Sequence, residues 1–165
     1  MILYPDLYIN NIKEITIEML NKNNIKGLIL DVDNTIIDYN KNILNGSIEW
    51  CEKLKQNGIK ICILSNSNKK EKVKNVAQQF NIEYIYFAKK PLKFGFNKAK
   101  QLLSLGHNNI AVVGDQIFTD VLGAHRSKMF AILTKPLEKK DIWITVLKRP
   151  IEEFIIKKYL RKKEK

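Results

Sequence analysis

The strongest constraint on the fold is a regular alternation of short apolar runs with amphipathic segments. The apolar runs hold four to six residues rich in Ile, Val, Leu and aromatic side chains, which is typical of strands covered on both faces. They lie at 27–32, 60–64, 84–87, 110–113 and 129–133. Segments with apolar residues at helical spacing lie at 12–21, 47–57, 69–80, 96–105 and 118–126. The alternation predicts an α/β fold, a doubly wound parallel five-stranded sheet with helices on both faces.

The length of 165 residues fits one domain. There is no internal repeat and no Ser- or Gly-rich linker, so we expect a single domain over residues 1–165. Its end, about residues 148–165, is basic and amphipathic. On a helix, one face there would hold Ile151, Phe154, Ile155 and Tyr159. This segment could lie on anionic lipid, or it could pack on the sheet and end in a solvated charged tail.

The charge of the chain favours polyanionic partners: nucleic acid, an anionic membrane surface or phosphorylated substrates. Lys and Arg outnumber Asp and Glu by 29 to 17, which gives a formal net charge of +12. No apolar run is long enough to span a bilayer, and the first residues lack the basic region of a signal peptide. The cysteines, Cys51 and Cys62, form no CxxC motif and indicate buried thiols in a reducing compartment. We expect a cytoplasmic protein, peripheral at the inner face of the membrane.

Polar residues follow the first four predicted strands, at the ends that a parallel sheet places along one edge. The set consists of Asp31, Asp33, Ser65, Asn66, Lys90, Asp115 and Asp120. Clustered carboxylates raise one another's pKa unless a cation neutralises them, and oxygen ligands beside a phosphate favour Mg²⁺. A hydroxyl and an ammonium group opposite the carboxylates suit a phosphoryl group. This edge of the sheet therefore predicts phosphoryl chemistry at a metal site.

Other arrangements that would indicate a different chemistry are missing from the sequence. There is no GxxxxGK[ST] loop, which disfavours a nucleotide triphosphatase of the P-loop type. No Ser-His-acid order is evident. The two histidines, His107 and His125, are expected to be solvated or to cap a helix.

The strand-end residues resemble the four motifs of the haloacid dehalogenase (HAD) superfamily of aspartate-nucleophile phosphotransferases. Its DxDxT motif is matched at 31–35, its strand-end Ser by Ser65, its Lys by Lys90 and its acidic motif by Asp115 and Asp120. More narrowly, the chain resembles the YqeG-type branch of HAD subclass IIIA, which includes phosphatidylglycerophosphate phosphatases. The stretches that carry this second resemblance are LDVDNT at 30–35, LSNSN at 64–68, AKKP at 88–91 and VVGDQIFTDVLGAHR at 112–126.

The resemblance implies a role for each matched residue. Asp31 would be the nucleophile, and Asp33 would be the general acid and then the base for the hydrolytic water. Mg²⁺ would be held by Asp31, by the backbone carbonyl of Asp33 and by Asp115. Asp120 would bind the ion through water or orient Lys90. The phosphate group would be bound by Ser65, Asn66 and Lys90, with Lys90 also offsetting charge in the transition state. Thr35 and Asn34 would fix the loop after the first strand or serve as plain turn residues.

The spacing of the motifs bears on the substrate. Asp31 lies 34 positions before Ser65, and Ser65 lies 25 before Lys90, which leaves no room for an inserted cap domain. An open site favours a lipid or macromolecular phosphate over a small sugar phosphate. We predict a capless, Mg²⁺-dependent phosphatase of phosphatidylglycerophosphate that contacts an anionic membrane. One alternative is a phosphatase of nucleotides, nucleic-acid ends or phosphoproteins. A second is an RNA- or ribosome-associated binding module with minor catalysis.

Overall fold

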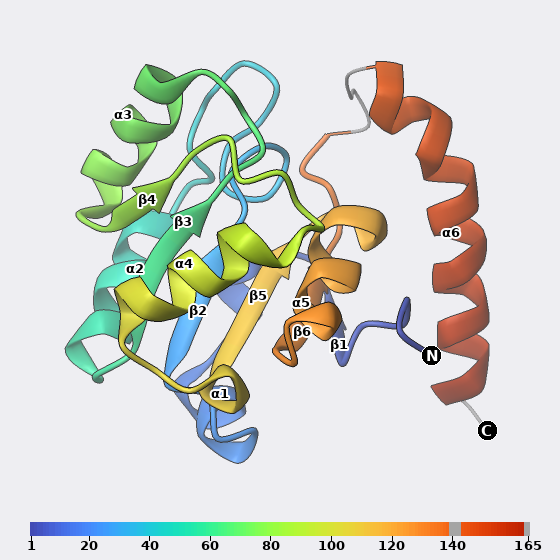
Figure 1. Ribbon diagram of the computed structural model, residues 1–165, viewed down its shortest axis with the longest axis horizontal. Coiled ribbons are helices and arrows are strands. Elements are labelled where there is room, and N and C mark those ends of the chain that lie inside the picture. The colour runs from blue at the N-terminus through green and yellow to red at the C-terminus, as the bar shows by residue number, and fades with distance from the viewer. Residues whose placement is uncertain (139–142, 164–165) are drawn as a thin grey trace.

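Six parallel strands form one sheet in the order β1-β6-β5-β2-β3-β4 (Figure 1). The computed structural model describes residues 1–138 and 143–163, and of residues 143–147 the backbone alone. The strands are β1 (Leu7–Ile9), β2 (Gly27–Leu30), β3 (Lys60–Leu64), β4 (Glu83–Ile85), β5 (Ile110–Gly114) and β6 (Phe130–Thr134). The predicted fold class is confirmed, and the five strands expected from the sequence are all present.

The sixth strand, β1, is the one that the sequence did not predict. It has three residues, too few for a periodic pattern, and it pairs with β6 so that Leu7 lies opposite Ile132. The Asp6 carboxylate strengthens this edge by accepting a hydrogen bond from the Ala131 N–H at 2.7 Å. The predicted leading helix over 12–21 is divided into a 3-10 turn, Ile12–Glu14, and helix α1 (Ile17–Lys22).

Helices cover both faces of the sheet, as expected for a doubly wound fold (Figure 1). On one face lie α1, α2 (Ser47–Gln56) and α3 (Lys70–Phe80). On the other face lie α4 (Lys93–Leu103) and α5 (Leu122–Arg126), and α6 (Trp143–Lys163) adds Ile155 and Ile156 to that core. Every residue of β2 and β5 is buried, which explains their unbroken apolar sequence. Cys51 and Cys62 are buried free thiols, and burial raises the pKa of Cys51 to about 11.

The strand order reverses direction at the pair β2 and β5. From β2 the chain proceeds outward to β3 and β4, whereas β5 and β6 lie on the other side of β2. Ligands of such sheets bind outside the carboxyl ends of the strands at this reversal. Residues 31–90 are all described and hold α2, β3, α3 and β4 with their connecting loops, so no domain is inserted there.

Helix α6 confirms the predicted helix at the end of the chain but not its predicted face. Glu152, Ile155, Ile156 and Tyr159 turn inward, whereas Phe154, which was expected on the same face as Ile155, is 62% exposed. The reason is that the Glu152 carboxylate accepts hydrogen bonds from the Phe118 N–H and from Arg149. These bonds turn the helix so that this polar side chain faces inward. Residues 164–165 of the predicted segment lie outside the described residues. Within the described chain, no helix has an apolar stretch long enough to cross a membrane.

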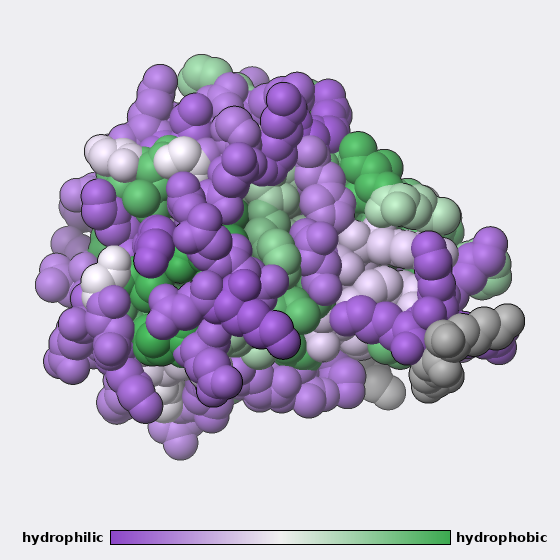
Figure 2. Space-filling view, turned by 90° about the horizontal axis from the view of Figure 1, so that it is seen from below, coloured by the Kyte–Doolittle hydropathy of each residue, from purple (hydrophilic) through white to green (hydrophobic). Residues whose placement is uncertain are grey.

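The amino-terminal edge of the strands carries a pocket of about 620 Å³ that none of the strand-end motifs reaches. Its lining includes Ile59, Lys60, Ile82 and Leu102. Figure 2 shows the molecule from this side, where apolar side chains gather among a largely hydrophilic surface.

Candidate active site

Asp31 occupies the centre of the carboxyl edge of the sheet. It follows β2 directly, and its N–H donates to the Val113 carbonyl of β5 at 2.9 Å. Its buried carboxylate accepts a hydrogen bond from Lys90 Nζ at 2.7 Å, through Oδ1. The Thr35 hydroxyl lies 3.3 Å from the other oxygen of Asp31 and 3.4 Å from Asp115 Oδ1. Thr35 therefore links the first acidic motif to the last.

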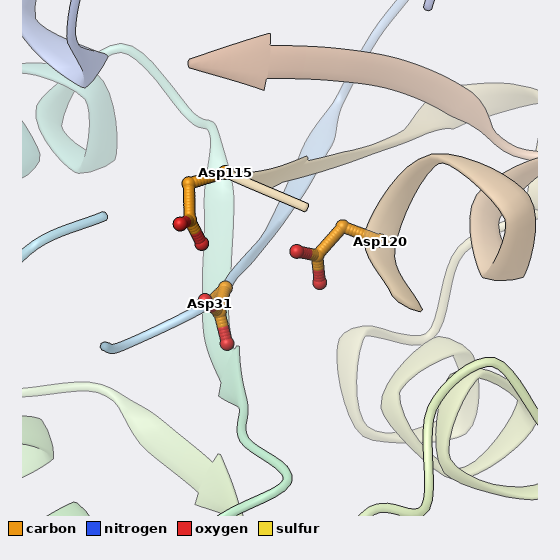
Figure 3. Close-up of side chains that lie close together, drawn as sticks. All are labelled: Asp31, Asp115 and Asp120. Carbon is orange, nitrogen blue, oxygen red and sulfur yellow. The ribbon is translucent and has the colours of Figure 1, made fainter. Parts of the chain in front are cut away.

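Three carboxylates meet at this point, and we call Asp31, Asp115 and Asp120 the acidic cluster (Figure 3). One oxygen from each lies within 4.8 Å of the others, and all three residues are buried. Asp115 follows β5 directly, and Asp120 projects from a π-helical turn, Ile117–Val121. The approach of Asp120 depends on Gly114, because a Cβ at that position would lie 2.2 Å from Asp120 Cγ. Three of the four acids predicted at the strand ends thus come together, and the fourth, Asp33, does not join them.

Lys90 lies between two members of the acidic cluster. Its ammonium group is 2.7 Å from Asp31 Oδ1 and 2.7 Å from Asp120 Oδ1, and its side chain is 3% exposed. Asn66 fixes the backbone of Lys90: it accepts from the Lys90 N–H at 2.6 Å and donates to the Lys90 carbonyl at 3.1 Å. The amide of Asn66 is thus engaged in positioning Lys90.

The predicted phosphate-binding residues differ in how they face the pocket above the acidic cluster. This pocket has a volume of about 730 Å³, and Asp31, Asn66, Ser67 and Lys90 are among the residues that line it. Ser65 is buried, and its hydroxyl oxygen accepts a hydrogen bond from the Ser67 N–H at 3.1 Å. In the loop over 65–68, Ser67 lines the pocket, whereas Ser65, which was predicted to bind phosphate, does not.

Asp33 stands apart from the acidic cluster. Its carboxylate is half-exposed on the wall of the pocket, where it forms an ion pair with Lys72 of α3. Lys72 was not among the residues predicted from the sequence. A signal was present, because Lys69, Lys70 and Lys72 open the helix that follows the second strand-end motif.

Helix α6 supplies two further residues that the sequence analysis missed. Arg149 donates to the Asp115 carbonyl oxygen at 2.8 Å and forms an ion pair with the Asp115 carboxylate. Glu152 accepts from Arg149 at 3.3 Å and from the Phe118 N–H at 3.1 Å, so it fixes both α6 and the turn that carries Asp120. No local pattern indicated these contacts, because Arg149 lies within a basic run 34 positions beyond Asp115.

The electrostatics of the site favour an additional cation. Burial raises the pKa of Asp31 to about 6 although Lys90 lowers it, and the charge of Asp120 raises it further. Burial and then the charge of Asp31 raise the pKa of Asp115, against the opposing effect of Arg149. For Lys90 burial acts to lower the pKa, but the charges of Asp120 and Asp31 outweigh it and raise that pKa. A divalent cation among the three carboxylates would offset their mutual repulsion, and carboxylate oxygens are ligands that a hard cation prefers.

Asn34 and His125 each hold together two segments that are distant along the chain. Asn34 has a positive φ of 60°, and its side-chain amide exchanges two hydrogen bonds with the backbone of Glu138. His125 lies 2.8 Å from the Ile2 carbonyl oxygen and 3.0 Å from the Asp6 carboxylate, so it holds the N-terminal segment. The first stabilises the loop that follows β2, and the second stabilises the edge strand β1.

Comparison with known proteins identifies relatives along almost the whole chain. A family model described as mitochondrial PGP phosphatase matches residues 1–138. YqeG of Bacillus subtilis (strain 168), described as a probable phosphatase, is 39% identical over 159 residues, which cover 96% of this chain and 92% of that protein. Phosphatidylglycerophosphate phosphatase 1, chloroplastic/mitochondrial, of Arabidopsis thaliana is 27% identical over 171 residues, which cover 96% of this chain and 48% of that protein.

Solved structures share the fold. An uncharacterized protein from Listeria monocytogenes serotype 4b superposes with a TM-score of 0.57 at 22% identity, over 71% of this chain and 85% of that one. The cobalt-bound deoxy-D-mannose-octulosonate 8-phosphate phosphatase YrbI of Haemophilus influenzae gives a TM-score of 0.50 at 17% identity, over 56% of this chain and 60% of that one. With the motifs in place at the strand ends, the family match shows that this chain belongs to the mitochondrial PGP phosphatase family of HAD-type phosphatases.

Proposed function

We propose that the protein is a Mg²⁺-dependent phosphomonoester hydrolase that uses Asp31 as its nucleophile and releases phosphate from phosphatidylglycerophosphate. The observation that carries the proposal is the position of Asp31. Its carboxylate lines the open pocket and is held by Lys90 and Thr35 beside two further carboxylates. Groups that are fixed in this way before substrate binds lose little entropy in the reaction.

The proposed reaction has two steps. A carboxylate oxygen of Asp31 forms a bond to phosphorus while the bond from phosphorus to the lipid alkoxide breaks, and Asp33 donates a proton to that alkoxide. A water molecule then attacks the aspartyl-phosphate, Asp33 takes a proton from it, and inorganic phosphate and free Asp31 result. Asp33 can reach such positions because it lines the same pocket. When a phosphate group is bound, its negative charge would give Lys72 an alternative partner to Asp33.

The acidic cluster fits a bound Mg²⁺ by the chemistry of its donors, which are all carboxylate oxygens. Asp31 and Asp115, with the backbone carbonyl of Asp33, would hold the ion, and Asp120 would bind it through water or orient Lys90. When bound, the ion offsets the repulsion between the anionic nucleophile and the anionic phosphate. The 2.7 Å contact between Lys90 and Asp120 supports the orienting role of Asp120.

Lys90 would stabilise the charge that develops on the phosphoryl oxygens. Its ammonium group already touches Asp31 Oδ1, so it lies next to the atom that attacks. Asn66 would act by fixing Lys90, and the hydroxyl groups and backbone N–H groups of the loop over 65–68 would bind phosphate oxygens. Lys41, Lys69 and Lys72 also line the pocket and make it attractive to a phosphate dianion.

Two findings support a phospholipid as the substrate. The matched family model and the Arabidopsis relative are both named for phosphatidylglycerophosphate phosphatases. No domain is inserted within residues 31–90, so the pocket is open to a headgroup that remains attached to a large assembly. The reaction would then take place at the cytoplasmic face of a membrane.

The test is release of inorganic phosphate by the purified full chain. Phosphatidylglycerophosphate in mixed micelles would be compared with soluble phosphomonoesters, with Mg²⁺ and with EDTA. Asp31→Asn would serve as the blank, and Asp38→Asn as a matched control, because Asp38 lines the pocket outside the acidic cluster. We expect Mg²⁺-dependent release from the lipid that only Asp31→Asn abolishes. Release from soluble esters alone would overturn the lipid substrate, and equal activity of Asp31→Asn would overturn the nucleophile.

A further inference from the structure

Exposed apolar side chains that no step of the proposed reaction uses lie on and beside the lining of the pocket. Tyr39 and Phe87 line the pocket itself, and Leu92 and Phe94 follow the pocket-lining Lys90 along the chain. Phe87 and Leu92 are exposed in the segment that joins β4 to α4, and Phe94, in the first turn of α4, is 76% exposed. Tyr39 is exposed as well. We call Tyr39, Phe87, Leu92 and Phe94 the apolar rim.

Lysines alternate with the apolar rim. Lys89 Nζ lies 5.0 Å from the centroid of the Phe87 ring, and Lys93 is exposed in the chain between Leu92 and Phe94. Such a surface suits anionic lipid, because cations remain with the headgroups while apolar side chains enter the boundary with the acyl chains. A surface built only to attract a soluble phosphate would need the cations and not the apolar groups.

The place of the apolar rim points to a bilayer as its partner. The phosphate of a phospholipid stays at the level of the headgroups, so the pocket must come to the membrane with its mouth first. The residues on and beside the lining of the pocket then contact lipid. Leu92 has neither a ring to stack on a base nor a polar atom in its side chain, so a nucleic acid would leave it unused. A bilayer accommodates the four apolar side chains and the lysines together.

We infer that the apolar rim docks the protein on an anionic lipid bilayer, with Asp31 facing the headgroups. The inference rests on the proposed function, because a substrate held in a membrane is what requires the mouth of the pocket to meet the bilayer. It assigns a membrane-binding role to the segment over 86–94, beside the catalytic role proposed for Lys90 in the same segment.

Helix α6 carries a rival surface. Ile151, Phe154 and Leu160 are exposed, and Lys158 Nζ lies 5.6 Å from the centroid of the Phe154 ring. In Figure 1, α6 stands beside β1 with its length along the strands, so its outer flank faces sideways from the edge at which the strands end. Docking through this flank would leave the pocket mouth off the membrane surface.

The test is binding of the full chain to vesicles, measured by co-sedimentation. The vesicles would be made of phosphatidylcholine alone or with phosphatidylglycerol, neither of which is the proposed substrate. Phe94→Ser and Leu92→Ser would be compared with Leu102→Ser, which removes a 38% exposed leucine from the opposite end of α4. Phe154→Ser would report on α6. Hydrolysis of a soluble phosphomonoester would verify that each variant keeps its site intact.

We expect the wild-type chain to bind the anionic vesicles more tightly than the neutral ones. Phe94→Ser and Leu92→Ser should each lower the partition coefficient by roughly tenfold, whereas Leu102→Ser and Phe154→Ser leave it unchanged. Equal binding of all variants, a loss confined to Phe154→Ser, or binding of RNA homopolymer without vesicle binding would overturn the inference. Vesicle binding without phosphatidylglycerophosphate hydrolysis would overturn only the proposed function, and hydrolysis without dependence on the rim would overturn only the docking.

Discussion

The strand ends and helix α6 both contribute charge to the acidic cluster, but they do so in different ways. The three carboxylates and Lys90 all come from residues 1–138, the stretch that the family model matches. Asp31 and Asp115 follow buried strands directly, and the Asp31 N–H donates to the Val113 carbonyl within the sheet. Arg149 comes from beyond that stretch and reaches Asp115 from a helix held mainly by side-chain contacts, among them Tyr159 against Tyr4.

The residues proposed to carry out the reaction therefore come from a different part of the chain than Arg149, which offsets negative charge in the acidic cluster. Asp31, the proposed nucleophile, lies where the backbone of a buried strand fixes it. Arg149 touches Asp115 and neither Asp31 nor Lys90 among its described contacts, so it acts on the acidic cluster through one member. Substitutions in each region can test this separation.

Asp31→Asn should lower phosphate release by roughly 10³-fold or more, because it removes the nucleophile. Steady-state kinetics with the preferred substrate and Mg²⁺ would measure the loss. The fold should persist, because asparagine has the same size and can still accept a hydrogen bond from Lys90. If Arg149→Ala lost as much activity as Asp31→Asn, the separation between the two regions would be wrong.

Lys90→Met should destabilise the metal-free protein by about 3–5 kcal/mol, because it leaves Asp31 and Asp120 buried without their shared cation. Urea unfolding in the presence of EDTA would measure the free energy of unfolding. Lys89→Met is the matched control, since Lys89 is the residue next to Lys90 and its side chain is exposed. A loss no larger than that of the control would contradict the electrostatic role of Lys90.

Arg149→Ala should enlarge the rise in melting temperature that Mg²⁺ causes. Without Arg149 the metal-free protein loses a partner of the buried Asp115 carboxylate, so a bound cation has more charge to neutralise. Thermal unfolding with Mg²⁺ and with EDTA would show the change. Arg161→Ala, an exposed position on the same helix, should respond to Mg²⁺ as the wild-type protein does. An unchanged Mg²⁺ response in Arg149→Ala would show that Arg149 does not act on the cluster.

His125→Gln should have a small effect that depends on pH. The hydrogen bond with Asp6 raises the pKa of His125 above the ordinary value of 6.5, so the stabilisation is complete below that value and disappears as the pH rises through the folded pKa. Burial acts to raise the pKa of Asp6, but the hydrogen bonds with His125 and the Ala131 N–H and the charge of His125 together lower it below 3.8, so acid also removes the stabilisation. The difference between the two proteins should be largest near about pH 5 and below about 1 kcal/mol, because both groups are partly exposed. Urea unfolding at about pH 5 and about pH 8 would measure it, and an equal difference at both would refute the assignment.

Strand β1 and helix α6 show where prediction from the sequence stops. Five strands could be predicted because each has a continuous apolar run, whereas Leu7–Ile9 becomes a strand through its pairing with β6. The inward face of α6 could not be predicted from its apolar spacing. Glu152 finds partners in Arg149 and in the Phe118 N–H, and these bonds offset the cost of burying a carboxylate.

The fold class and the meeting of Asp31, Asp115 and Asp120 could be predicted from the sequence, although Asp33 was expected with them. Strand ends are local features, and a parallel sheet brings the residues that follow them to one edge, so spacing along the chain was enough to join Asp31, Asp115 and Asp120. Only the packing of the helices brings Arg149 to Asp115 and Lys72 to Asp33, and leaves Phe94 exposed. These contacts depend on how helices pack against the sheet, and packing joins residues whose separation along the chain carries no repeating pattern.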